Sequence, residues 1–226
     1  MKNKNSSLRL TSGRKKKGEG LERRQEILEV AKKLFVGEGY ERTTIRRIAE
    51  QLGISSTALY VYFSDKYAIL EEISDTTFKI LKADLDRVIK EVHDPVDRLK
   101  EAITFYIRFG LEHPNEYQLT FNTRKAEEKE HQIDKGPALG HETFNRFRAV
   151  VSGAVAAKSD DELDGITQQL WTAMHGLVVL KTLWPSFPWT NSERLIDGHA
   201  SMLVSGVLAS RTGELCALTT SSGAGS

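Results

Sequence analysis

The stretch TTIRRIAEQLGISSTALYVYFSDK, which runs from Thr43 to Lys66, decides the fold expected for the first part of the chain. After Thr43, which suits an N-cap, apolar residues recur at helical spacing and predict a buried side made of Ile45, Ile48, Ala49 and Leu52. Gly53 then turns the chain, and a much shorter helix is predicted from Ser55 or Ser56 to Tyr62. Two helices joined by a tight glycine-containing turn are typical of the helix-turn-helix motif, whose second helix lies in a DNA major groove.

Helical periodicity continues on both sides of this stretch, and strand signals are nearly absent. One helix is predicted before the stretch, over residues 21–37, and a long one after it, capped by Ser64 or Asp65 and ending near His93. Further helices follow, and the fold class is predicted as all-α. The expected parts are a flexible basic arm at 1–20, a three-helix DNA-binding domain at 21–66, a larger helical ligand-binding and dimerisation domain at 67–212, and a flexible tail at 213–226.

The short helix leaves an unusual face once its apolar residues are assigned inward. If Leu59 and Phe63 hold it against its neighbours, the outward positions carry small or hydroxyl-bearing side chains, which let a helix backbone come close to bases and phosphates. From periodicity alone, a helical hairpin with tyrosines as amphipathic filler remains an alternative.

Composition and charge describe a globular chain of 226 residues with a basic N-terminal end. Residues 1–66 hold fifteen Lys and Arg against eight Asp and Glu, whereas the remainder holds seventeen against twenty-three. The basic end suits a polyanion. No apolar run could span a bilayer, no signal peptide is visible and Cys216 is the only cysteine, so a cytoplasmic location is expected, without disulfides or membrane partners.

The run FVGEGYERTTIRRIAEQLGISSTALYVYFSDKYAIL resembles the N-terminal DNA-binding domain of the TetR family of transcriptional regulators. The residues that carry this resemblance are Phe35, Gly39, Tyr40, Thr43, Thr44, Ile48, Ala49, Leu52, Gly53, Leu59, Tyr60, Phe63 and Lys66. The resemblance implies DNA contacts from Thr44, Arg46, Ser55, Ser56, Thr57, Ala58, Tyr60, Tyr62 and Lys66. Within this set, Arg46 is expected to read a base edge, whereas Tyr60, Tyr62 and Lys66 hold phosphates. Arg47 could contact DNA or lie on a solvated face.

The second half carries aromatic residues at helical spacing and few polar groups, which suits a mostly apolar small ligand. The candidate ligand-binding residues are Phe105, Tyr106, Phe109, Tyr117, Phe121, Trp171, Met174, His175 and Val178. An ordinary packed core is the competing interpretation. The segments HPNEYQLTF and LWTAMHGLVVL are similar to a C-terminal type that recurs in the TetR family, marked by Trp-x-x-x-His-Gly. Small and apolar residues on the last two long helices predict a dimer interface.

Together these features predict a ligand-responsive, homodimeric DNA-binding regulator, most simply a repressor released from a palindromic operator. A DNA-binding or architectural protein without a small-molecule effector, and an activator, are the alternatives. An enzyme is not expected, because the six histidines lack a metal-ligand spacing and neither a glycine-rich phosphate loop nor a nucleophile elbow is present. No cofactor and no metal are expected either.

Overall fold

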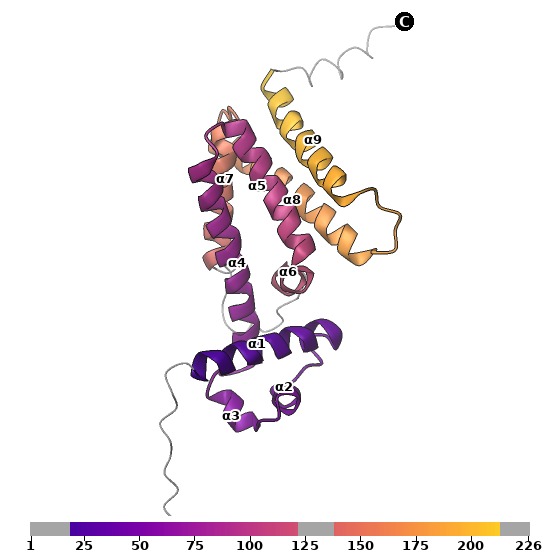
Figure 1. Ribbon diagram of the computed structural model, residues 1–226. Coiled ribbons are helices and arrows are strands. Elements are labelled where there is room, and N and C mark those ends of the chain that lie inside the picture. Colours follow the sequence, from indigo (N-terminus) through magenta and orange to yellow (C-terminus); the bar gives the residue numbers. More distant parts are fainter. Residues whose placement is uncertain (1–18, 122–137, 213–226) are drawn as a thin grey trace, which may run out of the picture. The chain divides into compact units, whose positions relative to one another are not determined.

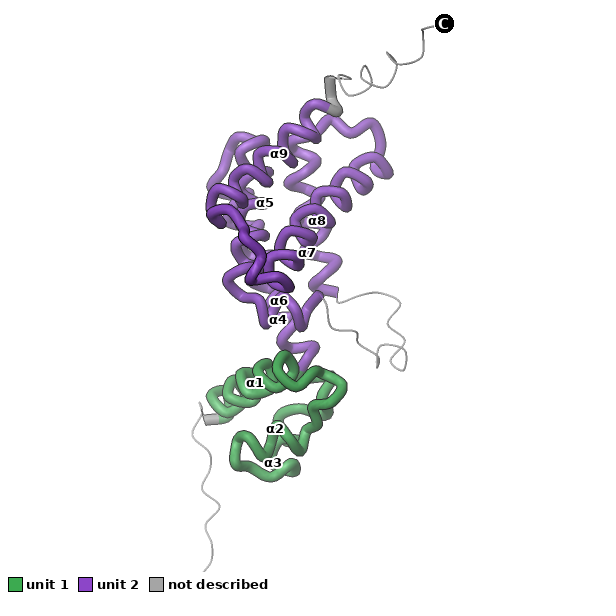
Figure 2. The backbone as a smooth tube through the Cα atoms, turned by 90° about the vertical axis from the view of Figure 1, so that its right-hand side faces the viewer, with its two compact units in different colours: residues 1–69 green, residues 70–226 purple. Residues whose placement is uncertain are grey.

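The computed structural model describes residues 19–121 and 138–212, and all the regular secondary structure in these ranges is helical (Figure 1). The predicted all-α class is therefore confirmed. The chain forms two compact units, Met1–Ile69 and Leu70–Ser226 (Figure 2). The predicted domain limits at residues 66 and 212 stay predictions. Residues 1–18 of the expected basic arm and the C-terminal tail, which includes Cys216, lie outside the described residues. So does the charged segment 123–135, for which composition predicts an exposed connection.

The first unit contains α1 (Glu19–Gly37), α2 (Ile45–Gln51) and α3 (Ser56–Tyr60). Its core is apolar, with Ile27, Ile48 and Leu59 fully buried. Thr44 is the N-cap of α2, so the predicted cap at Thr43 was wrong by one residue. Thr43 is instead buried, and its hydroxyl donates to the Gly39 carbonyl at 2.9 Å. This bond ties the α1–α2 connection to the start of α2.

The turn between α2 and α3 depends on Gly53, whose φ of +65° lies in the left-handed region that glycine adopts without strain. The α3 helix ends at Tyr60, two residues earlier than predicted, because only Ser56–Tyr60 adopt the helical hydrogen-bonding pattern. Leu59 and Phe63 are buried, as predicted, and they fix α3 against the rest of the first unit. Hence α3 is a single short turn held by its apolar side.

The second unit contains most of α4 (Lys66–Glu91) together with α5 to α9. These helices are α5 (Pro95–Glu112), α6 (Pro114–Phe121), α7 (Ala138–Ala154), α8 (Asp160–Leu183) and α9 (Ser192–Thr212). The central helix is α5, which packs against α7, α8 and α9 (Figure 1). Its N-terminus is set by Asp94, whose carboxylate accepts two backbone N–H groups, followed by Pro95 at the first helical position.

In this core, α5 and α8 approach each other closely at Gly110. A methyl group placed on Gly110 would lie 2.6 Å from Cγ1 of Val178, so only a glycine lets the two helices pack this tightly. None of the described helices is long and apolar enough to cross a membrane.

Candidate nucleic-acid interface and ligand cavity

Two of the predicted DNA contacts, Thr44 and Ser55, are helix N-caps with exposed side chains. The Thr44 hydroxyl oxygen accepts the Arg47 N–H and the Ser55 hydroxyl oxygen accepts the Ala58 N–H, each at 3.1 Å. A hydroxyl that accepts a helix N–H still has its own hydrogen to donate. Both caps therefore offer an outward donor suited to a phosphate oxygen.

The exposed face of α3 carries Thr57 and Tyr60, and the latter side chain is 55% exposed. Ser56, Ala58 and Tyr62 are half-buried. Val61, which follows α3, is 74% exposed; the sequence-based contact set omitted it, although an exposed apolar residue on a reading helix suits a thymine methyl group. In the helix predicted up to Tyr62, helical spacing places Val61 on the outward side, but an aliphatic side chain carries no hydrogen-bonding signal.

The two arginines of α2 differ in how they are held. Arg46 is 83% exposed, and its partner among the described residues is Glu50 on the same helix, at 2.8 Å. Arg47 instead forms three hydrogen bonds with Glu38, the shortest at 2.7 Å, which lower the pKa of that carboxyl. Arg46 is thus the more available long side chain, and its predicted base contact stays a prediction.

Lys66 is placed differently from a phosphate-holding lysine. Its side chain is only 15% exposed, and its ammonium donates to the Tyr40 carbonyl oxygen at 3.0 Å. The same nitrogen lies 4.1 Å from the centroid of the Tyr40 ring, within cation–π range. In the free protein, Lys66 therefore joins the start of α4 to the end of the α1–α2 connection.

The second unit contains a cavity of about 740 Å³, within the range of about 300–1,000 Å³ typical of small-molecule sites. It lies between α4, α5, α6, α7 and α8 and is lined largely by aromatic and aliphatic side chains. The lining residues are Phe78, Leu81, Leu85, Ala102, Phe105, Tyr106, Thr120, Phe121, Gly140, His141, Thr143, Phe144, Phe147, Gln168, Trp171, Thr172 and Met174.

Five of the nine predicted ligand-binding residues line this cavity, namely Phe105, Tyr106, Phe121, Trp171 and Met174. Phe109 and Val178 do not: both are buried, Phe109 lies against the ring of His113 at the end of α5, and Val178 packs on Gly110. Tyr117 and His175 also lie outside the lining. Periodicity alone could not separate these two roles, because cavity and core residues share the same apolar helix faces.

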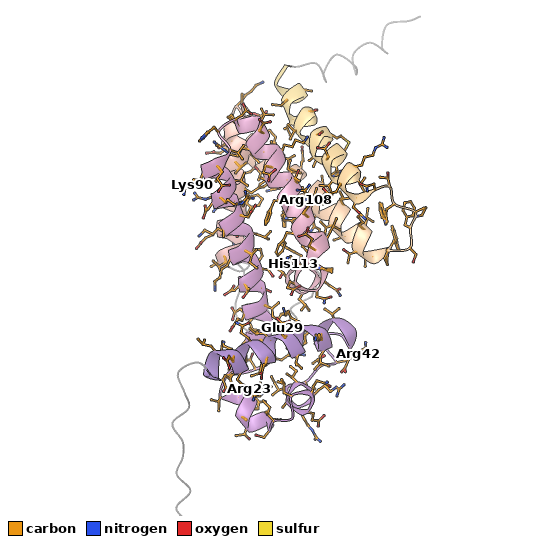
Figure 3. All side chains as sticks on the ribbon, in the orientation of Figure 1. Arg23, Glu29, Arg42, Lys90, Arg108 and His113 are labelled. Atoms are coloured by element: carbon orange, nitrogen blue, oxygen red, sulfur yellow. The ribbon has the colours of Figure 1, made fainter. Side chains whose placement is uncertain are left out.

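The structure adds lining residues from α4 and α7, among them Phe78, Leu81, Leu85, Phe144 and Phe147. The sequence-based set of ligand-binding residues included none from these two helices. Arg108, which Figure 3 labels on α5, is exposed. Its guanidinium pairs with the Glu193 carboxylate at 2.6 Å.

Tyr117 and His175 remain connected to the cavity through a chain of hydrogen bonds. The Trp171 indole N–H donates to the Tyr106 hydroxyl at 3.1 Å, and the Tyr106 and Tyr117 hydroxyls are 2.9 Å apart. The Tyr117 hydroxyl lies 2.6 Å from Nδ1 of His175. Burial raises the pKa of Tyr106 to about 12, raises that of Tyr117 and lowers that of His175, so all three groups are neutral near pH 7.

On α8 and α9, the helices predicted to form a dimer interface, some apolar side chains are buried and others are exposed. Leu177, Ala200 and Val204 are among the small and apolar residues from which the interface is predicted, but they are buried within the chain itself. Other large apolar side chains near the end of α8 and on α9 are exposed: Leu180, Leu183, Trp184, Phe187 and Met202. We call these five residues the apolar end.

Comparison with known proteins agrees with both units. A family model described as "Bacterial regulatory proteins, tetR family" matches residues 27–73, which include α2 and α3. A second, described as "Tetracyclin repressor-like, C-terminal domain", matches residues 99–194. Fold and site thus define a helix-turn-helix regulator with a helical, cavity-bearing second unit. The two matches span more than half of the chain, and the chain belongs to the TetR family of bacterial regulatory proteins. The narrower Trp-x-x-x-His-Gly assignment stays a prediction.

Individual relatives are similar over less than half of the chain. The HTH-type transcriptional regulator HbdR of Aromatoleum sp. (strain CIB) is 36% identical over 85 residues, covering 38% of this chain and 37% of the relative. The nucleoid occlusion factor SlmA of Vibrio vulnificus (strain YJ016) is 30% identical over 93 residues, covering 41% and 47%. The aligned part therefore spans less than half the length of either relative.

Solved structures match over most of the chain. The TetR family transcriptional regulator PfmR from Thermus thermophilus has a TM-score of 0.60 and 26% identity, covering 79% of this chain and 97% of that one. The fatty acid degradation regulator FadR from Bacillus halodurans has a TM-score of 0.62 and 14% identity, covering 84% and 97%. At the latter identity, the likeness concerns the fold alone.

Proposed function

We propose that this protein is a DNA-binding transcriptional repressor that acts as a homodimer on a palindromic operator and leaves it when a small, mostly apolar effector fills the cavity. The observation that carries the proposal is the course of α4. This helix begins at Lys66, directly after the helix-turn-helix, and supplies Phe78, Leu81 and Leu85 to the cavity wall. One continuous helix thus belongs to both the DNA-binding unit and the effector site.

A population shift would provide the control. An effector that binds more tightly to a tilted arrangement of α4 would shift the protein toward that arrangement by its difference in affinity for the two states. Two short reading helices must lie about 34–36 Å apart to enter successive major grooves, so a small change in their spacing weakens binding strongly.

Dimerisation is proposed to use the apolar end of α8 and α9. Four of the five residues, Leu180, Leu183, Trp184 and Phe187, follow closely in the chain at the end of α8, and a cluster of exposed large apolar side chains marks an interaction surface. A second copy of the chain is the partner required by a palindromic site, since one α3 can contact only a few base pairs.

The experiment is a fluorescence-anisotropy titration of the full chain on the DNA upstream of its own gene, at about 0.15 M salt, with unrelated duplex as competitor. We expect sequence-specific binding that weakens when a cavity ligand is added. Equal affinity for the upstream and unrelated duplexes would contradict the regulator proposal.

A second candidate is a DNA-binding protein without a small-molecule effector, and one similar protein, SlmA, is named a nucleoid occlusion factor and not a transcriptional regulator. Thermal denaturation separates the two. A cavity ligand at about 100 times its Kd should stabilise the folded chain by about 2.7 kcal/mol, whereas a protein that binds no effector would show no shift with any apolar compound tested.

A further inference from the structure

Several hydrogen-bond donors on the cavity wall have a partner within the protein. These donors point to that partner and not into the cavity. A chain of four residues runs from the wall into the protein: Trp171 and Tyr106 line the cavity, while Tyr117 and His175 lie behind them. The indole N–H can only donate, so the Tyr106 oxygen accepts that bond.

The short contact between Tyr117 and His175 fixes the direction of the remaining bonds. A separation of 2.6 Å suits a hydroxyl donating to a ring nitrogen and is short for an N–H donating to oxygen. Tyr117 therefore donates to Nδ1 of His175, and its oxygen accepts from the Tyr106 hydroxyl at 2.9 Å. Every polar hydrogen of Trp171, Tyr106 and Tyr117 is then used within the protein.

The opposite direction leaves one hydrogen without a partner. If Nδ1 of His175 donated to Tyr117, the Tyr117 hydroxyl would donate to Tyr106, which already accepts from Trp171. The Tyr106 hydroxyl hydrogen would then have no acceptor among the described residues. Buried polar groups are almost always paired, so this arrangement is disfavoured.

Three threonines of the wall likewise donate their hydroxyl hydrogens to groups of the protein. The hydroxyls of Thr120, Thr143 and Thr172 donate to the backbone carbonyls of Glu116, Leu139 and Gln169, at 2.8, 2.7 and 3.0 Å. Each hydrogen is thereby consumed, and each oxygen retains lone pairs. Together with the Tyr106 oxygen, these three hydroxyls offer the cavity acceptors while their own hydrogens are used within the protein.

Charged side chains do not offset these hydrogen-bond acceptors in the described part of the wall. Among the described lining residues there is no Lys, Arg, Asp or Glu. A wall made largely of aromatic and aliphatic side chains offers an anion no charge to replace its hydration. Gln168 and His141 could donate, but both are exposed, so water competes for their bonds.

From this polarity we propose that the cavity selects an apolar effector that carries a hydroxyl as hydrogen-bond donor, and discriminates against molecules whose polar group only accepts or is anionic. This selectivity presupposes the effector role proposed above. Tyr106 is the contacting residue, and Tyr117 and His175 are positioning residues that hold its hydrogen away from the cavity.

Four compounds with one skeleton test the selectivity: biphenyl, para-hydroxybiphenyl, para-methoxybiphenyl and biphenyl-para-carboxylate. Calorimetric titration of the full chain gives a Kd for each. We expect the hydroxy compound to bind about tenfold more tightly than the methoxy compound, the effect of one net hydrogen bond, and the carboxylate to bind most weakly.

Two variants test the mechanism. Tyr117→Phe removes the acceptor of the Tyr106 hydroxyl, which then turns its hydrogen to the cavity, so the tenfold preference should disappear because the methoxy compound binds more tightly. Tyr106→Phe removes the wall acceptor itself and should abolish the preference because the hydroxy compound binds more weakly. Thr182→Val, which deletes a hydroxyl of α8 outside the wall, is the matched control and should keep the wild-type ratio.

The outcomes separate the selectivity from the proposed function. Binding of biphenyl with equal affinities for the hydroxy and methoxy compounds overturns the selectivity and leaves the effector cavity intact. A preference that survives in both Tyr variants overturns the role of the hydrogen-bond chain. Failure of all four compounds to bind, in a folded protein, overturns the cavity as a ligand site and the selectivity with it.

Discussion

The ammonium of Lys66 lies 4.1 Å from the centroid of the Tyr40 ring and donates to the Tyr40 carbonyl oxygen at 3.0 Å. It also lies 3.9 Å from a carboxylate oxygen of Glu41. A single lysine thus joins the first residue of α4 to the chain between α1 and α2. The resemblance to the TetR family implies that Lys66 contacts a DNA phosphate. In the structure the same nitrogen makes contacts inside the protein, so the two roles require different positions of the side chain.

Replacement of Lys66 by methionine should destabilise the free protein by about 1–3 kcal/mol, because a charge-assisted hydrogen bond and a cation–π contact are lost while the aliphatic stem is kept. Urea unfolding of the full chain measures the loss. Unchanged stability would contradict the internal role. The salt dependence of DNA binding reports the other role, since loss of one phosphate contact reduces the slope by about 0.9.

Arg46→Ala should relax sequence preference by about 1–3 kcal/mol, because Arg46 is the exposed long side chain of α2 and is paired with Glu50. Anisotropy titrations on the operator and on singly substituted operators measure the change. Arg47→Ala is the matched control, because the Arg47 guanidinium forms an ion pair with Glu38. An equal loss of affinity on every duplex for Arg46→Ala would contradict a base contact.

Gly110→Ala should cost about 1–3 kcal/mol of stability through overpacking, because its methyl would meet Val178 at 2.6 Å and Tyr117 at 3.0 Å. The double variant with Val178→Ala should recover part of the loss relative to the sum of the single variants. Gly165→Ala is the control in α8, where nothing lies within 4 Å, and it should be neutral or stabilising. Chemical denaturation compares the wild type with the three single variants and the double variant.

The free energy of unfolding should fall on mild acidification, because His175 resists protonation in the folded chain. Burial lowers its folded-state pKa, and the groups facing it are the rings of Tyr117, Phe121 and Trp171, which carry no charge. Below the unfolded value of about 6.5 the unfolded chain takes up a proton that the folded chain resists. The stabilising effect of neutral His175 is therefore present above this pH and is lost as the pH falls toward the folded pKa.

His175→Gln removes the titration while an amide oxygen can still accept from Tyr117. Wild type should lose more stability than this variant between about pH 7.5 and 5.5, as measured by urea midpoints at each pH. Parallel pH profiles for the two proteins would argue against a lowered His175 pKa.

Leu183→Glu should shift the protein from dimer to monomer, because a charge placed in the apolar end would be buried without a partner in the proposed interface. Light scattering coupled to size exclusion measures the mass. Ile80→Glu is the control, since Ile80 is an exposed apolar residue of α4, at 45%, outside the apolar end. A dimer that persists in Leu183→Glu, or is lost in both variants, would contradict the proposed interface.

The sequence alone determined the all-α class, the helix-turn-helix and the inward side of its third helix. Leu59 and Phe63 are buried and Gly53 has positive φ, as local periodicity and turn chemistry require. Such features depend on residues close together in the chain, so a single sequence carries them in full.

Only the tertiary structure decided which apolar residues line a cavity and which fill the core. Phe105 and Phe109 lie on one helix at a spacing of one turn, yet the first lines the cavity and the second is buried at 3% exposure. The difference arises from packing against α4, α7 and α8, and from hydrogen bonds such as that between Tyr117 and His175, 58 residues apart. Periodicity specifies the face of a helix that avoids water, whereas the partner that meets this face is set by long-range packing.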